Sequence, residues 1–154
     1  MAKREHKTAR ASGTAHLSGV AMLANAVRKA VIEAPDEVPL APAAQARPEV
    51  VRELSRYGYS EKELSRYVVP KRTLARRRSE NELLTVEETD KALRLGRIAV
   101  LAERIFGDPA KAQRWMRKPK RSLSGETPLA YLASEHGARV VEEMLRRIEY
   151  GIFA

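Results

Sequence analysis

Apolar residues recur every three or four positions along most of the chain after residue 48, which is the spacing of helices with one buried face. The first such set is Val50, Val51, Leu54 and Tyr57. Pro48 suits the first turn of a helix, and Gly58 is a residue at which helices commonly end. The pattern therefore predicts a short helix between these two residues.

Two more short helices are predicted around a tight turn. Ser60 and Glu63 have the spacing of a capping box, in which each side chain bonds the other residue's backbone N–H. An inward stripe follows, formed by Leu64, Tyr67 and Val68. Val69-Pro70 breaks this helix, because proline disfavours helical geometry in the residue before it, and a third helix should run from Lys71 to Arg78.

A longer helix is predicted from Thr85 to about Phe106. Thr85 and Glu88 repeat the capping-box spacing, and Gly107 follows the last apolar residue. The helix has two apolar stripes: Leu95, Ile98, Ala102 and Ile105 form one, and Leu93, Gly96 and Val100 form the other. A helix with two apolar stripes packs against more than one surface, so we expect it to bridge two halves of the molecule or to support dimerisation.

The remainder of the chain predicts three further helical segments, each opened by a capping residue. Asp108-Pro109 starts a segment that Pro119 ends, Thr127-Pro128 starts a single turn, and Ser134 caps a final helix. The inward stripe of the final helix is Val140, Val141, Met144, Leu145 and Ile148. Its outer face has two pairs at i,i+4 spacing, Glu142 with Arg146 and Glu143 with Arg147. Trp115, the single tryptophan, is predicted to anchor the core.

These segments predict an all-α protein, a helix-turn-helix half followed by a small helical C-terminal domain. The expected divisions are residues 1–47, a basic extension with a helix and a Pro/Ala linker; 48–104, the helix-turn-helix and the bridging helix; and 105–154. The linker is indicated by Pro35, Pro39, Pro42 and Pro48, which prevent a continuous helix. With 154 residues and 44% hydrophobic composition, the chain can form one modest core or two small ones.

The charge of the chain favours a polyanionic partner, and its composition argues against catalysis. Its formal charge is +9, which favours nucleic acid. It contains no cysteine, and His6, His16 and His136 lie far apart without metal-ligand spacing, so no metal, cofactor or catalytic site is predicted. A basic start before Leu17–Val27 superficially resembles a secretory signal, but the polar interruptions favour an amphipathic helix and a cytoplasmic protein without membrane contact.

Basic residues in the third predicted helix form the candidate DNA-binding site. Lys71, Arg72, Thr73, Arg76 and Arg77 are the predicted contacts, with Leu74 as the inward anchor. The alternative is that the arginines only complement the helix C-terminus and stay solvated. A second basic run, Arg114, Arg117, Lys118, Lys120 and Arg121, is compatible with a DNA surface, with a surface for acidic groups of a partner, or with a solvated loop.

Several motifs in the second half resemble the toxin-binding domain of Xre/MbcA/ParS-type antitoxins. They are Phe106-Gly107-Asp108-Pro109, Ala112, Trp115, Leu123, Gly125, Thr127-Pro128-Leu129, Gly137-Ala138 and Ile148-Glu149-Tyr150-Gly151. Upstream, Arg72-Thr73-Leu74, Arg76-Arg77, Leu84-Thr85 and Glu88 resemble the helix-turn-helix half of the same family. The resemblance covers about Pro48 to Ala154.

The resemblance implies a non-enzymatic antitoxin that neutralises a RES-domain toxin, an enzyme that uses NAD. It also implies repression of its own operon by binding operator DNA, and we expect a homodimer within a toxin–antitoxin hetero-oligomer. The predicted toxin-binding residues are Tyr150, Gly151, Ile152, Phe153 and Ala154, the end of which would lie at the toxin's NAD pocket. From the residues alone, Ile152 and Phe153 suit either a partner's pocket or folding back on their own core. The competing function is a dimeric helix-turn-helix regulator without a toxin partner.

Overall fold

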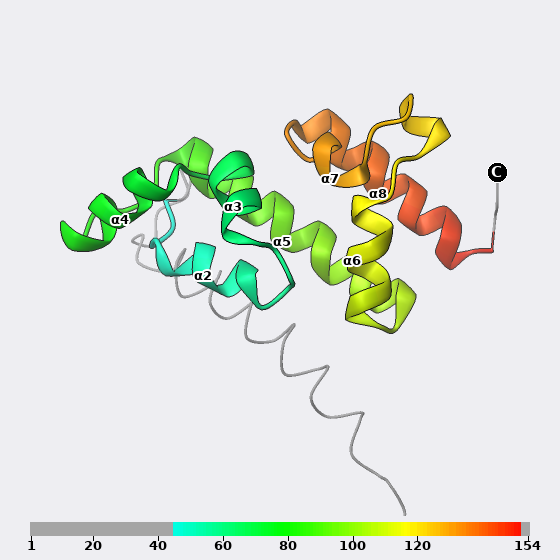
Figure 1. The fold of residues 1–154 in the computed structure, drawn as a ribbon, viewed down its shortest axis with the longest axis horizontal. Coiled ribbons are helices and arrows are strands. Elements are labelled where there is room, and N and C mark those ends of the chain that lie inside the picture. Colours follow the sequence, from blue (N-terminus) through cyan, green and yellow to red (C-terminus); the bar gives the residue numbers. More distant parts are fainter. Residues whose placement is uncertain (1–44, 152–154) are drawn as a thin grey trace, which may run out of the picture.

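The computed structural model describes residues 45–151, and every regular element in this range is a helix (Figure 1). The elements are α2 (Glu49–Ser55), α3 (Glu61–Tyr67), α4 (Lys71–Ser79), α5 (Val86–Phe106), α6 (Pro109–Arg117), the 3₁₀ turn η1 (Arg121–Leu123), α7 (Pro128–Tyr131) and α8 (Glu135–Glu149). The all-α prediction is therefore confirmed. The predicted helix and linker of residues 1–47 lie mostly outside the described residues.

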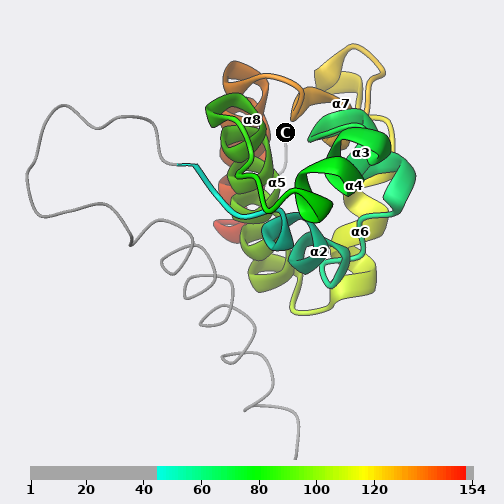
Figure 2. The same ribbon diagram turned by 90° about the vertical axis from the view of Figure 1, so that its left-hand side faces the viewer.

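The longest helix, α5, is the axis of the molecule. It packs against α2, α6 and α8, so that elements from both predicted halves touch the same helix. In Figure 2, α8 lies on one side of α5, and α3 and α6 lie on the other. The two apolar stripes of this helix therefore serve the bridging role that the sequence predicts.

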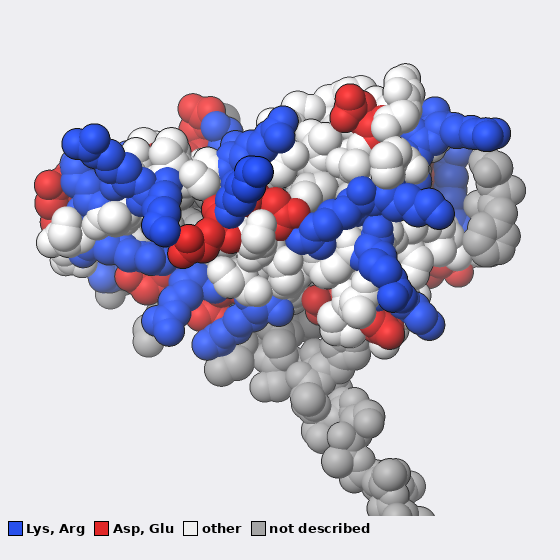
Figure 3. Space-filling model, viewed as in Figure 1, with Lys and Arg blue, Asp and Glu red and all other residues white. Residues whose placement is uncertain are grey.

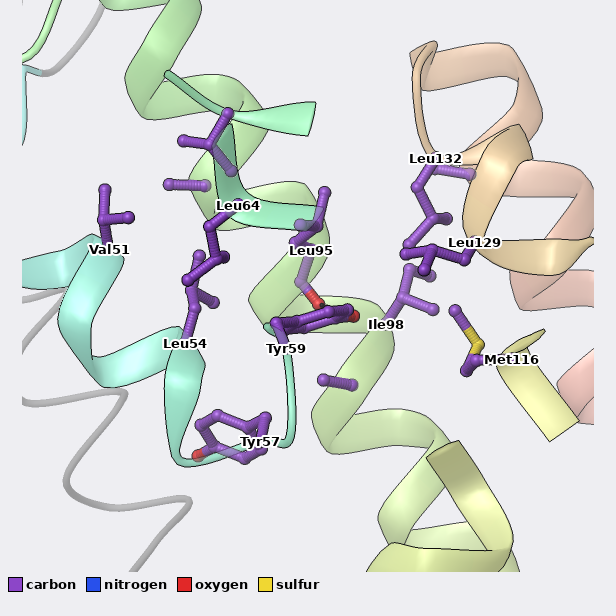
Figure 4. Close-up of a cluster of buried hydrophobic side chains, with 14 of the residues drawn as sticks. Val51, Leu54, Tyr57, Tyr59, Leu64, Leu95, Ile98, Met116, Leu129 and Leu132 are labelled. Atoms are coloured by element: carbon purple, nitrogen blue, oxygen red, sulfur yellow. Dashed lines mark hydrogen bonds between the residues drawn. The ribbon is translucent and has the colours of Figure 1, made fainter. Parts of the chain in front are cut away.

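One hydrophobic cluster runs through the molecule without a break between the two halves. On one side of α5, Leu54 and Tyr59 meet Leu95; further along, Ile98 meets Met116 and its neighbours from α7 (Figure 4). The buried Tyr59 hydroxyl donates a 3.1 Å hydrogen bond to the Leu95 carbonyl oxygen. A shared core means that the orientation of one half relative to the other is fixed by packing.

The helix ends follow the local chemistry of the sequence. The structure has both predicted capping boxes, Ser60 with Glu63 and Thr85 with Glu88. The side chains of Asp108, Thr127 and Ser134 also accept a backbone N–H from their own helices. Gly107 ends α5 with φ +63°, a conformation that glycine adopts without steric cost. The positions of Pro48 and Pro70 differ slightly from the prediction. Each is the N-cap residue just before its helix and does not lie in the first helical turn.

Two apolar predictions need correction. Trp115 packs against the core but is only partly buried, with its ring centroid 5.8 Å from that of Phe106, whereas Met116 beside it is the fully buried residue of α6. On α8, Val141 and Leu145 are fully buried, but Val140, Met144 and Ile148 are only half-buried. Within residues 45–151, no helix combines the length and apolarity needed to cross a membrane.

Candidate DNA-binding and partner-binding surfaces

The α3–α4 pair has the form of a helix-turn-helix whose second helix lies on the surface. Val68 and Val69 are buried in the turn, where both backbone N–H groups donate to the Leu64 carbonyl oxygen. The first N–H of α4, from Lys71, donates to the Ser65 hydroxyl of α3 at 3.2 Å. No residue of α4 is fully buried. This helix is thus held in place at its start and left open along its outer face.

Arg77 was predicted to contact DNA, but it is held inside the protein. Its guanidinium lies 3.1 Å from the Glu88 carboxylate and 3.2 Å from that of Glu82. Both Arg77 and Glu88 side chains are only 14% exposed. Because Glu88 also caps α5, this ion pair ties α4 to the start of the central helix. The geometry gives Arg77 a positioning role.

Two other predicted DNA contacts already have carboxylate partners at the surface. Arg76 lies 2.8 Å from Glu80 and 3.0 Å from Glu82, and Lys71 lies 2.9 Å from Glu61. These pairs are well exposed, so water screens them and they hold the side chains weakly. A phosphate could replace the carboxylate in each pair.

Arg72 and Arg78 are the exposed arginines of α4 that form no ion pair within residues 45–151. Thr73, also predicted as a contact, is half-buried beside Leu74. At 100° per residue, Arg77 lies only 60° from Leu74, whereas Arg78 lies 40° from it on the other side. Whether Arg77 or Arg78 is exposed therefore depends on which side of Leu74 faces α5. Helical spacing alone does not show which side that is.

The second candidate surface is one side of α8. Its buried side contains Gly137, Ala138, Val141 and Leu145. Next to it, Val140, Met144 and Ile148 form a partly buried row, which we call the α8 apolar stripe; none of the three belongs to the core cluster. Tyr150, which follows α8, is 75% exposed. Apolar side chains aligned on a surface in this way are typical of a protein interface.

The other edge of α8 is fixed to α5 by charged pairs. Glu135 lies 3.1 Å from Arg94 and 2.9 Å from Arg97, and Glu149 lies 3.2 Å from Arg104. The hydrogen bond from Arg97, followed by that from Arg94, lowers the pKa of Glu135 against the opposing effect of burial. Of these arginines only Arg94 is largely buried; the pairs of Arg97 and Arg104 are exposed and screened by water, so the orientation of α8 depends mainly on its buried side.

A close contact at the start of α8 explains its glycine. A Cβ atom on Gly137 would lie 2.0 Å from the backbone carbonyl oxygen of Tyr131, which is far inside van der Waals contact. This approach packs α7 directly onto α8. Of the predicted toxin-binding residues, Tyr150 and Gly151 are described, and Ile152, Phe153 and Ala154 lie outside the described residues.

Metal-binding chemistry has no candidate in the part of the chain that the structure describes. Across residues 45–151, no three His, Asp or Glu side chains gather as metal ligands would. His136 is exposed on the first turn of α8.

Comparison with known proteins matches two family models to this chain. The Antitoxin Xre-like helix-turn-helix domain matches residues 39–97, and the Antitoxin Xre/MbcA/ParS C-terminal toxin-binding domain matches residues 101–151. The chain belongs to the Xre-type antitoxin family. The first matched region contains α2, α3, α4 and the first part of α5, and the second contains the end of α5 together with α6, α7 and α8.

Curated relatives agree with this membership. The chain is 43% identical over 84 residues to "Antitoxin Xre" of Pseudomonas putida, a match covering 54% of this chain and 53% of that protein. It is 36% identical over 87 residues to "Antitoxin Xre" of Yersinia enterocolitica, covering 56% and 59% respectively. A third "Antitoxin Xre", from Photorhabdus laumondii, is 38% identical over 82 residues, covering 53% and 55%. The matched part of this Xre-type chain thus spans somewhat more than half the length of each relative.

Proposed function

We propose that this chain is an antitoxin that binds and neutralises a RES-domain, NAD-using toxin and represses its own operon through the helix-turn-helix. The main support is the α8 apolar stripe, a partly buried row outside the core cluster, within the region that matches a toxin-binding family model. The chain acts by binding rather than by catalysis. It works as a homodimer within a hetero-oligomer with the toxin.

In the proposed mechanism, α8 is the rigid docking surface for the toxin, and the segment Tyr150–Ala154 blocks the toxin's active site. The apolar stripe docks on the toxin, and burial of its three side chains supplies affinity without opening the antitoxin's own core. The segment after Gly151 then enters the toxin's NAD pocket and excludes the substrate. When Ile152 and Phe153 fill this pocket and displace its water, no space is left for NAD to bind.

For DNA binding, we propose that Arg72 and Arg78 make the first contacts from α4. Both are exposed and without an ion pair within the described range, so neither needs to give up a partner. Lys71 and Arg76 exchange carboxylate for phosphate, and Thr73 lies beside them. Arg77 holds α4 against α5 in the orientation that enters the major groove.

The toxin proposal is tested by co-expressing the chain with the product of the reading frame adjacent to its own gene. Met144→Lys with Ile148→Lys places two charges on the stripe, and a second variant lacks Ile152–Ala154. We expect both to lose protection of the cells and of their NAD pool while keeping operator affinity within about twofold, since α4 is untouched. Arg147→Gln, on the same helix but outside the stripe, is the matched control and should protect fully.

Two outcomes would contradict this proposal. If the stripe variant still copurifies with the toxin and protects, the docking surface lies elsewhere. If the neighbouring product is not toxic and does not bind the chain, the competing function, a dimeric regulator without a toxin, is correct. Light scattering of the chain alone and of the complex tests the homodimer separately.

The DNA proposal is tested with a duplex from the region upstream of the chain's own gene. Arg72→Ala with Arg78→Ala should weaken binding and lower the salt dependence by about one unit of slope for each lost phosphate contact. Thermal unfolding should be nearly unchanged, because neither side chain forms an ion pair in the described range. Unchanged affinity would place the DNA site on another element.

A further inference from the structure

The outward face of α6 is basic, although α6 belongs to the toxin-binding domain. Lys111 and Arg114 are exposed and lie 60° apart at 100° per residue, and Lys118, the C-cap residue just after α6, is exposed as well. No acidic residue occurs between Asp108 and Glu126. Within residues 45–151, none of the three forms an ion pair, whereas the exposed arginines of α8 do.

The charges beside this face repel one another. Burial, together with the nearby charge of Lys118, lowers the pKa of Lys120 below its ordinary value. The Lys120 ammonium stays 4.9 Å above the ring of Trp115, which offers a weak cation–π contact. Asp108 at the start of α6 offsets part of this repulsion, since the charges of Lys111 and Arg114 help to lower its pKa. An anionic partner would offset the rest.

The inner side of α6 fixes this face next to the helix-turn-helix. Arg117 makes two 2.7 Å hydrogen bonds to the Glu63 carboxylate of α3 and one of 2.8 Å to the Gly58 carbonyl oxygen. Gln113 donates to the Tyr57 carbonyl oxygen. Burial alone would raise the pKa of Glu63, but hydrogen bonds from Arg117 and Ser60 outweigh it and lower that pKa. The outward sides of α3 and α6 are thereby joined into one surface.

This surface continues from α6 across α3 to α4. Lys62 and Arg66 are exposed on α3, and neither forms an ion pair within residues 45–151. Figure 3 shows Lys and Arg side chains gathered over α4, α3 and α6 on the same face of the molecule. The 21 residues of α5, which lies beneath, span about 31 Å at 1.5 Å per residue. One turn of B-DNA is about 34 Å long, which is close to the length of α5.

We propose that Lys111 and Arg114 of α6, with Lys118 just after it, contact the phosphate backbone of the same DNA duplex that α4 reads. This rests on the proposed DNA binding and extends the DNA footprint into the toxin-binding domain. Phosphate contacts are independent of sequence, so α6 adds affinity and orientation while α4 supplies base recognition. The helix α8, which carries the stripe proposed for toxin binding, lies across α5 from α6 (Figure 2), so the DNA and the toxin are proposed to use different helices.

The test is a variant of the full chain with Lys111→Gln, Arg114→Gln and Lys118→Gln. Affinity is measured by fluorescence anisotropy for the upstream duplex and for a duplex of unrelated sequence, between about 50 and 200 mM salt. We expect at least a tenfold loss on both duplexes and a salt slope smaller by about 2 to 3, since each lost phosphate contact removes about 0.9. Toxin neutralisation should be unchanged.

The matched control is Arg139→Gln, Arg146→Gln and Arg147→Gln, which removes the same net charge from the exposed face of α8. Equal loss in the two variants would mean that only net charge matters, and would overturn the proposal. So would an unchanged slope in the α6 variant, or loss of toxin neutralisation with intact DNA binding, which would assign the face to the toxin. Arg72→Ala with Arg78→Ala separates these outcomes, because it alone tests whether α4 reads the duplex.

Discussion

The helices α4 and α8 are proposed to bind different partners, DNA and a toxin, and they are attached to the rest of the fold by different interactions. α8 buries four residues, two of them the large apolar side chains Val141 and Leu145. α4 buries no residue fully; the half-buried Leu74, the Arg77 pair and the hydrogen bond to Ser65 keep it in place. One helix is anchored by hydrophobic burial and the other mainly by polar contacts.

This difference fits what each helix is proposed to contact. DNA is polar and highly charged, so a helix that enters its groove presents polar side chains and needs positioning more than burial. A protein partner is bound largely through apolar contact, so α8 needs a strong attachment that leaves spare apolar surface. The four predictions below test this contrast, starting with the largest expected effect.

Truncating one apolar anchor in each helix should affect stability very differently. Leu145→Ala removes a fully buried side chain and should lower the free energy of unfolding by about 3 kcal/mol. Leu74→Ala removes a half-buried side chain and should cost about 1 kcal/mol. Urea unfolding followed by circular dichroism measures both. Equal losses would show that α4 depends on burial as much as α8 does.

Breaking the ion pair beneath α4 should cost about 2 kcal/mol. Arg77→Met keeps the apolar stem but leaves the Glu88 carboxylate without its partner in a largely buried place. Arg72→Met is the matched control on the exposed side, and it should stay within about 0.5 kcal/mol of the parent. Denaturant titration of the three proteins gives the comparison. If the two variants are equally stable, α4 does not depend on Arg77.

Glu63 of α3 and Arg117 of α6 form an ion pair, which we call the α3–α6 bridge. Removing it should alter how the stability of the chain changes in acid. The pKa of Glu63 is lowered in the folded chain, so the bridge stabilises fully above the unfolded value of about 4.3 and is lost as pH falls through the folded pKa. Glu63→Gln should cost about 1.5 kcal/mol at neutral pH and flatten this acid dependence. Melting temperatures across acid pH measure it.

A control for the acid experiment is Glu61→Gln, which removes a fully exposed carboxylate paired with Lys71. Water screens that pair, so the melting temperature at neutral pH should change far less than in the Glu63 variant. An identical acid response in both variants would show that the bridge does not contribute.

The smallest effect is expected on the outer face of α8. Arg147 lies 3.1 Å from Glu143 at i,i+4 spacing, with both side chains more than half exposed. Arg147→Gln should therefore cost only about 0.3 kcal/mol. A loss above about 1 kcal/mol in the denaturant titration would mean that surface pairs contribute to holding α8, and the contrast with α4 would weaken.

The caps and the helix ends could be predicted because they depend on residues close together in sequence. Ser60 with Glu63, Thr85 with Glu88, and Gly107 after Phe106 each form within one turn of backbone. The two stripes of α5 were likewise visible, since a helix in contact with several partners must be apolar on more than one side. These features fixed the order of the helices and the role of α5.

The candidate sites were predicted less completely, because exposure and pairing depend on distant segments. Arg77 looked like its neighbours until Glu88, eleven residues later, proved to be its partner. Arg117 belonged to a basic run, but Glu63 binds it from 54 residues away. The stripe of Val140, Met144 and Ile148 had the spacing of a buried face, and only the packing of α8 on α5 showed which apolar residues stayed half-exposed.

The sequence by itself determined the helical class, the helix boundaries and the family resemblance, since all three rest on short-range spacing. Only the tertiary structure decided which basic residues are free for DNA and which hold the fold together. It also decided that α6 shares a face with α3. The physical reason is that a charge acts according to what lies within a few ångströms of it, and packing sets those neighbours.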